Sequence, residues 1–186
     1  YSNIQFSIQE GDYFCVNPKL NVGTSDLRYT SFTYPFVMNG TVRTLLGKYN
    51  RCNKLNQTTA YINTMRYAGA YYIVAEAYCR KGETEAARVL INHYWHCIGV
   101  SEAPAGITNQ ALLELILTDK QREFVGEGVN FFDLKRTHLA SLPRYSQWGT
   151  GASSSISSTD YRWNFPIPVS EYRFNSVEQN AGWPSN

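Results

Sequence analysis

Residues 66–77, RYAGAYYIVAEA, decide the fold of this chain. Small and apolar side chains recur there at three- and four-residue spacing, which predicts an amphipathic helix over about residues 60–81. Gly82 follows Arg80 and Lys81, and a glycine just past two cations is a typical helix end. The predicted apolar stripe of this helix comprises Tyr61, Met65, Ala68, Tyr72, Ala75 and Cys79.

A second helix is predicted to open at Glu83 and Glu85, directly after the glycine turn. Two helices joined by so short a turn must be antiparallel neighbours. The apolar stripe of the second helix comprises Ala86, Ala87, Leu90, Ile91, Tyr94 and Ile98.

A third helix is predicted from Thr108, a typical N-cap residue, to about Val125. Ile107 and Leu112 are spaced as a hydrophobic staple around that cap. A short helix should follow over residues 131–137, and the glycine- and serine-rich residues 138–160 favour a flexible loop. These elements together predict a mainly α fold.

The N-terminal part of the chain has a different character. Residues 1–57 are rich in Gly, Asn, Thr and Tyr with short alternating runs, so we predict a loop-rich segment of the same domain, with residues 58–186 as the helical part. A chain of 186 residues is expected to form one compact domain. Long irregular segments should therefore flank the helices at both ends.

Composition excludes several classes of protein. A net charge of +2 with 43% hydrophobic residues argues against disorder and against a nucleic-acid footprint. The 4 cysteines lack CxxC spacing and are too few for a disulfide scaffold. No apolar run reaches the roughly 18 residues of a transmembrane helix. The 14 tyrosines suit either helix packing or a surface that binds amphipathic ligands.

Four segments follow one another in a recognisable order. They are residues 66–77 with Gly82 and Ala86-Ala87, residues 122–128 (REFVGEG) running into 131–136 (FFDLKR), residues 165–168 (FPIP) with Glu171, and Asn175 with Gln179-Asn180 and Gly182-Trp183. This series resembles the SusD/RagB family of bacterial outer-membrane glycan-capture lipoproteins, over residues 66–183 and more loosely over 26–28 and 48–49. Asp119-Lys120, Gly126 and Asn130 depart from the family pattern, which would weaken a local ion network.

The resemblance carries expectations about fold and function. It implies a tetratricopeptide-like antiparallel helix pair with further helices, and non-catalytic capture of an oligosaccharide or related nutrient without a cofactor. The implied partner is a SusC-like TonB-dependent transporter, and the implied location is the outer surface of the bacterial outer membrane. Two readings of other classes stay open: a tetratricopeptide-type module that docks a peptide, and a helical glycan hydrolase.

Family members are usually longer than this chain and carry a lipidated N-terminal Cys and further helical repeats. We therefore expect the C-terminal portion of such a protein, anchored to the membrane only through an N-terminal lipid that the chain lacks. Tyr71, Ile73 and Val74 lie off the first helix's stripe and should form an apolar patch that needs a cover.

A loop tryptophan is the foremost candidate for ligand binding. Trp148 lies between Gln147 and Gly149, where a large ring has no helix face to cover and could stack on a sugar. Tyr145, Tyr29 and Tyr34 are further candidates, and a structural role is the alternative for all four. Trp163, Phe165 and Ile167 alternate and should share one side, with Trp163 in the core.

The charged residues of the second segment, residues 122–136, favour a structural role over a catalytic one. Glu123 and Glu127 lie one helical turn apart and point the same way, whereas a glycosidase needs carboxylates on opposite sides of a sugar. We predict instead a partly buried ion network that joins the first and third helices. Its members are Arg66, Glu123, Glu127, Asp133 and Arg136.

A metal site and a disulfide are not expected. His93 and Cys97 share a helix face beside His96, but zinc needs further ligands and only His138 and Cys79 could supply them. Cys79 and Cys97 lie at different distances from the Gly82 turn, so their thiols should not meet.

Overall fold

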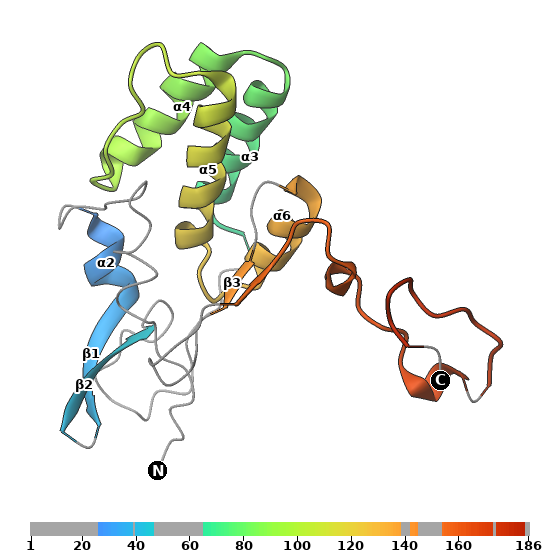
Figure 1. Ribbon diagram of the computed structural model, residues 1–186. Helices are drawn as coiled ribbons and strands as arrows, with labels where there is room; N and C mark the ends of the chain where they lie inside the picture. Colours follow the sequence, from blue (N-terminus) through green and yellow to red (C-terminus); the bar gives the residue numbers. More distant parts are fainter. Residues whose placement is uncertain are drawn as a thin grey trace. The chain divides into compact units, whose positions relative to one another are not determined.

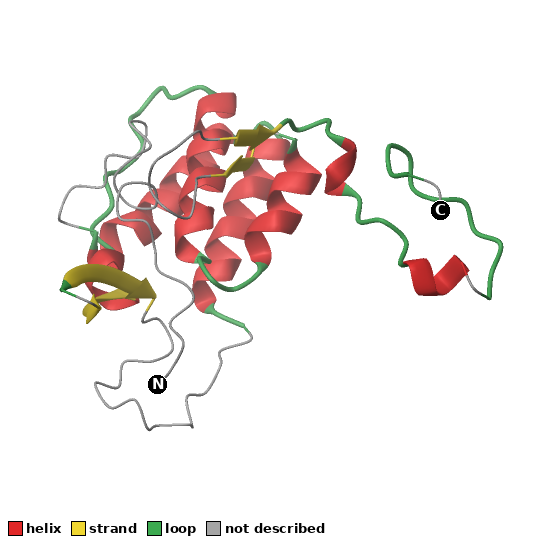
Figure 2. Ribbon diagram, turned by 60° about the horizontal axis from the view of Figure 1, so that its bottom comes forward, coloured by secondary structure: helices red, strands yellow, loops and turns green. Residues whose placement is uncertain are grey.

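A computed structural model of the chain describes residues 26–38, 40–46, 65–138, 142–144, 154–172 and 174–184. The chain divides into two compact units, residues 1–127 and 128–186. The first unit contains α2 (Leu27–Phe32), β1 (Thr33–Met38), β2 (Thr41–Leu46), α3 (Tyr67–Arg80), α4 (Thr84–Cys97) and α5 (Asn109–Glu123) (Figure 1). The second contains α6 (Val129–Thr137), β3 (Leu142–Arg144), β4 (Ser154–Ile156), the 3-10 helix η2 (Tyr161–Trp163) and α7 (Val169–Tyr172). The described chain is mainly α, as predicted (Figure 2).

The helix pair of the first unit is tetratricopeptide-like, as the resemblance implied. Helix α3 ends at Arg80, Gly82 adopts a left-handed φ of 79°, and α4 begins two residues later. Glycine favours this left-handed backbone conformation because it has no Cβ to clash with the backbone. Helix α5 packs on both α3 and α4 (Figure 1).

The core of the first unit comes from the predicted stripes, with two differences. Tyr72, Ala75 and Cys79 of α3 are buried, as predicted. Met65 is 92% exposed and Arg66 is extended, so α3 begins at Tyr67 rather than near residue 60. The stripe of α4 was predicted less well, because Ala86 is exposed and the buried Trp95 was missed.

Side-chain hydrogen bonds fix the start of α5 and the loop before it. The Thr108 hydroxyl accepts a hydrogen bond from the Ala111 N–H, so the predicted N-cap is confirmed. The buried Asn92 amide donates to the Ala103 carbonyl at 3.0 Å and accepts from the Ala103 N–H at 2.8 Å, which fixes the loop before α5. The Asn109 amide donates to the Cys79 carbonyl at 2.8 Å. The start of α5 is thereby held against the end of α3.

Residues 27–46 are more regular than the predicted loop-rich segment. Helix α2 runs directly into β1, which pairs antiparallel with β2 from Thr33↔Leu46 to Met38↔Thr41. Two residues join the strands, and their sequence Asn39-Gly40 is a strong hairpin signal. The division expected at residue 57 lies outside the described residues and stays a prediction.

The second unit packs around Trp163. Its ring is buried 5.5 Å from that of Phe131, and its indole N–H donates to the Ser157 carbonyl at 2.7 Å. The predicted core position of Trp163 is confirmed, and the exposed Phe165 ring stacks on the same Phe131 ring at 5.1 Å. A side that Ile167 shares with them stays a prediction. The loop predicted over residues 138–160 contains the strand pair β3–β4.

Candidate functional site

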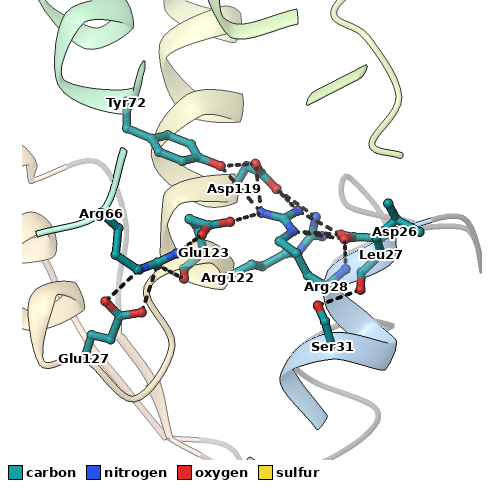
Figure 3. Close-up of polar contacts among 10 residues, drawn as sticks. All are labelled: Asp26, Leu27, Arg28, Ser31, Arg66, Tyr72, Asp119, Arg122, Glu123 and Glu127. Atoms are coloured by element: carbon teal, nitrogen blue, oxygen red, sulfur yellow. Dashed lines mark hydrogen bonds and ion pairs between the residues drawn. The ribbon is translucent and has the colours of Figure 1, made fainter. Parts of the chain in front are cut away.

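The most extensive polar cluster among the described residues is a buried ion network in the first unit, centred on Arg28. Its guanidinium donates to Asp26 at 2.8 Å and to Asp119 of α5 at 2.6 Å. A third carboxylate, that of Glu123 on α5, lies 3.3 Å away. The Tyr72 hydroxyl of α3 donates to Asp119 at 2.5 Å. Figure 3 shows these side chains converging on one guanidinium.

Arg66 extends the network toward the end of α5. It pairs with Glu123, donates to the Glu123 carbonyl at 2.7 Å and pairs with Glu127 at 2.8 Å. Its guanidinium also lies 4.6 Å from the centre of the Phe124 ring, a cation–π geometry. Glu123 therefore accepts from both Arg66 and Arg28, and the predicted join between the first and third helices is confirmed for Arg66, Glu123 and Glu127.

The remaining predicted members lie in the second unit. Asp133 and Arg136 pair with each other at 2.6 Å, one turn apart on α6. Their membership of the network stays a prediction. Arg28 was missed because it lies in the weakly matched residues 26–28, and its position in the sequence does not reveal that it reaches α5.

Opposite charges dominate the electrostatics of the network. Burial lowers the pKa of the Arg28 guanidinium, but the charge of Asp119 and the hydrogen bonds to Asp26 and Asp119 outweigh burial and raise the pKa overall. Burial and the Asp119 charge raise the pKa of the Tyr72 phenol. The network therefore holds charged arginine and protonated tyrosine donors against carboxylate acceptors.

This arrangement is unsuited to acid–base catalysis on a bound sugar. Glu123 is buried and accepts from two arginines, and Glu127 pairs with Arg66. The Glu123 carboxylate lies between the Arg66 and Arg28 guanidinium groups, and the Glu127 carboxylate faces Arg66 (Figure 3). A general acid needs a carboxyl that can reach a glycosidic oxygen and exchange its proton.

Two of the four predicted ligand residues lie in described elements, and two do not. Tyr29 follows Arg28 within α2, and Tyr34 lies on β1, the next element. Tyr145 and Trp148 lie outside the described residues. Their ligand-binding roles stay predictions.

An aromatic ladder on the helix pair was not singled out from the sequence. Tyr71 stacks on Tyr94 with ring centres 5.1 Å apart, and Tyr67 meets Tyr71 edge-on at 5.4 Å. Tyr67, Ile73 and Val74 of α3 are exposed, so two members of the predicted apolar patch lie at the surface. Tyr71 is half-buried because it packs on Tyr94.

The residues considered for a metal or a disulfide are dispersed. Cys79 is buried, Cys97 is exposed, and both carry free thiols. His96 lies 3.3 Å from Glu102, and His138 contacts the Ser158 carbonyl at 3.0 Å. In the part of the chain that the structure describes, no three His, Cys, Asp or Glu side chains are grouped to hold a metal ion. No helix there has both the length and the apolar character to cross a membrane.

The fold and the network define a tetratricopeptide-like helical protein with a mainly structural polar centre. A sequence profile described as the SusD family matches residues 2–183. The chain belongs to the SusD family. No curated protein sequence matches it.

Solved structures support the fold. A SusD superfamily protein from Bacteroides vulgatus ATCC 8482 superposes with a TM-score of 0.66 at 24% identity, covering 90% of this chain and 38% of that one. A SusD-like carbohydrate binding protein from the same strain gives a TM-score of 0.60 at 17% identity, covering 87% and 39%. A SusD-like protein from Bacteroides fragilis NCTC 9343 gives 0.55 at 22% identity, covering 76% and 30%. This chain thus spans less than two fifths of the length of each of these relatives.

Proposed function

We propose that this chain takes part in non-catalytic binding of an oligosaccharide or related nutrient at the bacterial outer-membrane surface and in its delivery to a SusC-like TonB-dependent transporter. The observation that carries the proposal is the SusD family match over residues 2–183. One of the solved structures that it resembles is described as a carbohydrate binding protein. A lipid anchor in the full-length protein is part of the same proposal.

Aromatic stacking is the physical mechanism that we propose. Trp148, Tyr145, Tyr29 and Tyr34 would offer ring faces to the apolar faces of pyranose units, while amide and charged groups orient the hydroxyls. Burial of about 60 Å² of apolar surface at about 25 cal/mol per Å² is worth about 1.5 kcal/mol, or roughly tenfold in affinity. A site with a few such contacts binds modestly.

The absence of catalysis is also proposed. Glu123 and Glu127 are the closely spaced acidic pair that raised the hydrolase alternative, and both are engaged by arginine. We expect no release of reducing sugar from oligosaccharides that the chain binds. Release that disappears in Glu123→Gln would favour the hydrolase.

The direct test is calorimetry against a panel of plant and host oligosaccharides. We expect at least one member to bind, and Trp148→Ala to weaken that binding about tenfold without changing the melting temperature. Normal binding by Trp148→Ala would contradict the role of Trp148. Failure of the wild-type chain to bind any member would count against the proposed function.

Peptide docking is the second candidate function. It is favoured by Tyr67, Ile73 and Val74, which expose apolar surface along α3. An Ile73→Asp variant separates the two candidates, because peptide docking on α3 would be lost while sugar binding by the other aromatics would persist. If the wild-type chain binds sugars and Ile73→Asp changes neither its sugar binding nor its peptide binding, docking on α3 is excluded as the main function.

A further inference from the structure

We infer that Arg28 is a positioning residue, which clamps residues 26–46 onto α3 and α5 and so sets where Tyr29 and Tyr34 stand relative to a ligand. The role in ligand placement rests on the proposed function. The clamp itself rests on the geometry of the ion network alone.

The clamped segment consists of short elements. Helix α2 has 6 residues, and β1 and β2 form a two-stranded sheet. A helix of this length and an isolated hairpin are each marginal in water without tertiary contacts. Because β1 begins at the residue after α2 ends, the direction of β1 follows from how α2 is held.

The start of α2 is held from three sides. The Leu27 N–H donates to the Ile98 carbonyl at 2.9 Å, which ties the backbone to the end of α4. The Arg28 side chain reaches Asp119 and Glu123 on α5. Its Nη1 also lies 3.5 Å from the Tyr72 hydroxyl of α3. Each contact crosses from residues 26–28 to a different helix of the core.

Asp26 aims the guanidinium. Its carboxylate accepts from the Arg28 backbone N–H at 2.9 Å and from the guanidinium Nε and Nη2 at 3.0 and 2.8 Å. A carboxylate that binds both the backbone and the side chain of Arg28 leaves the guanidinium few orientations. The end of the planar fork then meets Asp119, to which Nη2 donates at 2.6 Å and Nη1 at 3.2 Å (Figure 3).

The clamp is separable from the apolar core. Ala75, Ile91, Leu112 and Ile116 belong to α3, α4 and α5 and are fully buried. Those helices supply their own apolar packing, so loss of the clamp should release residues 29–46 before it unfolds the helices. Lysine cannot replace Arg28 fully, because an ammonium group lacks the two-sided planar fork.

The test compares Arg28→Met with Leu112→Ala, a matched destabilised control whose side chain lies in the core of α5. Hydrogen exchange of residues 29–46 is measured well below the melting temperature of each variant. We expect exchange in this segment to rise at least tenfold in Arg28→Met, with α3–α5 still protected. Leu112→Ala should raise exchange in α3–α5 without selective release of the segment.

Affinity is then measured with the oligosaccharide that the wild-type chain binds most tightly in the panel. We expect Arg28→Met to weaken binding about tenfold, Arg28→Lys to weaken it less, and Leu112→Ala to bind as the wild type does. If Arg28→Met does not fold, Arg28→Lys is tested with the same expected direction in both measurements.

Two results would overturn the inference. One is unchanged hydrogen exchange of residues 29–46 in the Arg28 variants, which would show that Arg28 does not clamp this segment. The other is faster exchange of the segment with unchanged oligosaccharide affinity, which would show that the clamp plays no part in ligand placement. A wild-type chain that binds no oligosaccharide would instead contradict the proposed function, and the exchange measurement would still decide whether Arg28 is a clamp.

Discussion

Asp26-Leu27-Arg28 in the first unit and Asp160-Tyr161-Arg162 in the second form the same local motif in different surroundings. In each, the arginine N–H donates to the aspartate at 2.9 Å and Nη2 donates to the second oxygen at 2.8 Å. The side chains are 3% and 0% exposed for Arg28 and Asp26, but 47% and 19% exposed for Arg162 and Asp160. Only Arg28 also pairs with carboxylates from a distant helix.

The difference shows that local geometry does not determine what an ion pair contributes. An exposed pair competes with water and gains little, whereas removal of one buried partner leaves others uncompensated in a poorly solvated site. The same Asp-x-Arg motif can therefore hold a segment in place in one unit and contribute little to stability at the surface of the other.

The largest effect is expected for Arg28→Met. It removes the shared cation from Asp26, Asp119 and Glu123, while Asp119 keeps Arg122 at 3.4 Å and Glu123 keeps Arg66. We therefore expect the free energy of unfolding to fall by about 3 kcal/mol. Urea denaturation followed by circular dichroism measures this loss. A loss below about 1 kcal/mol would mean that the buried Asp26–Arg28 motif contributes no more to stability than an exposed ion pair does.

Glu127→Ala should have a smaller effect than Arg28→Met. Glu127 is one of two carboxylates on Arg66, and Arg66 keeps Glu123 when Glu127 is removed. We expect a loss of about 2 kcal/mol, as for a partly buried charged hydrogen bond. Glu85→Ala is the control, because Glu85 pairs with Arg88 on the exposed side of α4. Equal melting temperatures for Glu127→Ala and the wild type would contradict the prediction.

Gly182→Ala tests how the second unit is held together near its exposed motif. Gly182 has a φ of 88°, and a Cβ there would overlap the ring of Tyr161, the middle residue of the motif. We expect a loss of about 1–3 kcal/mol from backbone strain and this overlap. Gly82→Ala is the matched control, because Gly82 has a φ of 79° but open space around it. Equal losses in a denaturant titration would mean that contact with Tyr161 adds nothing.

The smallest effect is expected for Arg162→Met, which should lower the melting temperature at neutral pH only slightly, because solvent screens this exposed pair. Hydrogen bonds from the Arg162 side chain and backbone lower the pKa of Asp160 from 3.8 to about 2. Because the folded pKa is depressed, the contribution of the pair is complete above the unfolded value and is lost as the pH falls toward 2. A carboxyl NMR titration should show the pKa of Asp160 rising in Arg162→Met. An unchanged pKa would assign the shift to the backbone N–H alone.

The sequence predicts the helices of this fold well because they depend on local periodicity. The stripe at Ala68, Tyr72, Ala75 and Cys79, the Gly82 turn and the Thr108 cap each follow from neighbours within a few residues. The start of α3 was placed too early, because Tyr61 and Met65 continue the period but the backbone at Arg66 is extended.

The candidate site was less predictable because it depends on contacts between distant residues. Arg66, Glu123 and Glu127 could be grouped because their helices were predicted to pack together. Arg28 lies 91 positions from Asp119, and no spacing rule joins a residue at the start of α2 to one on α5. The identical Asp-x-Arg sequence at residue 160 shows that the motif alone could not have revealed which copy is buried.

A pair of double-mutant cycles tests most directly the claim that burial and distant partners make Arg28 a clamp. One cycle combines Arg28→Met with Asp119→Asn, and the other combines Arg162→Met with Asp160→Asn, each followed by urea denaturation. We predict a coupling of about 2 kcal/mol for Arg28 with Asp119 and a much smaller coupling for the solvent-exposed pair of Arg162 with Asp160. Couplings of similar size in the two cycles would contradict the account.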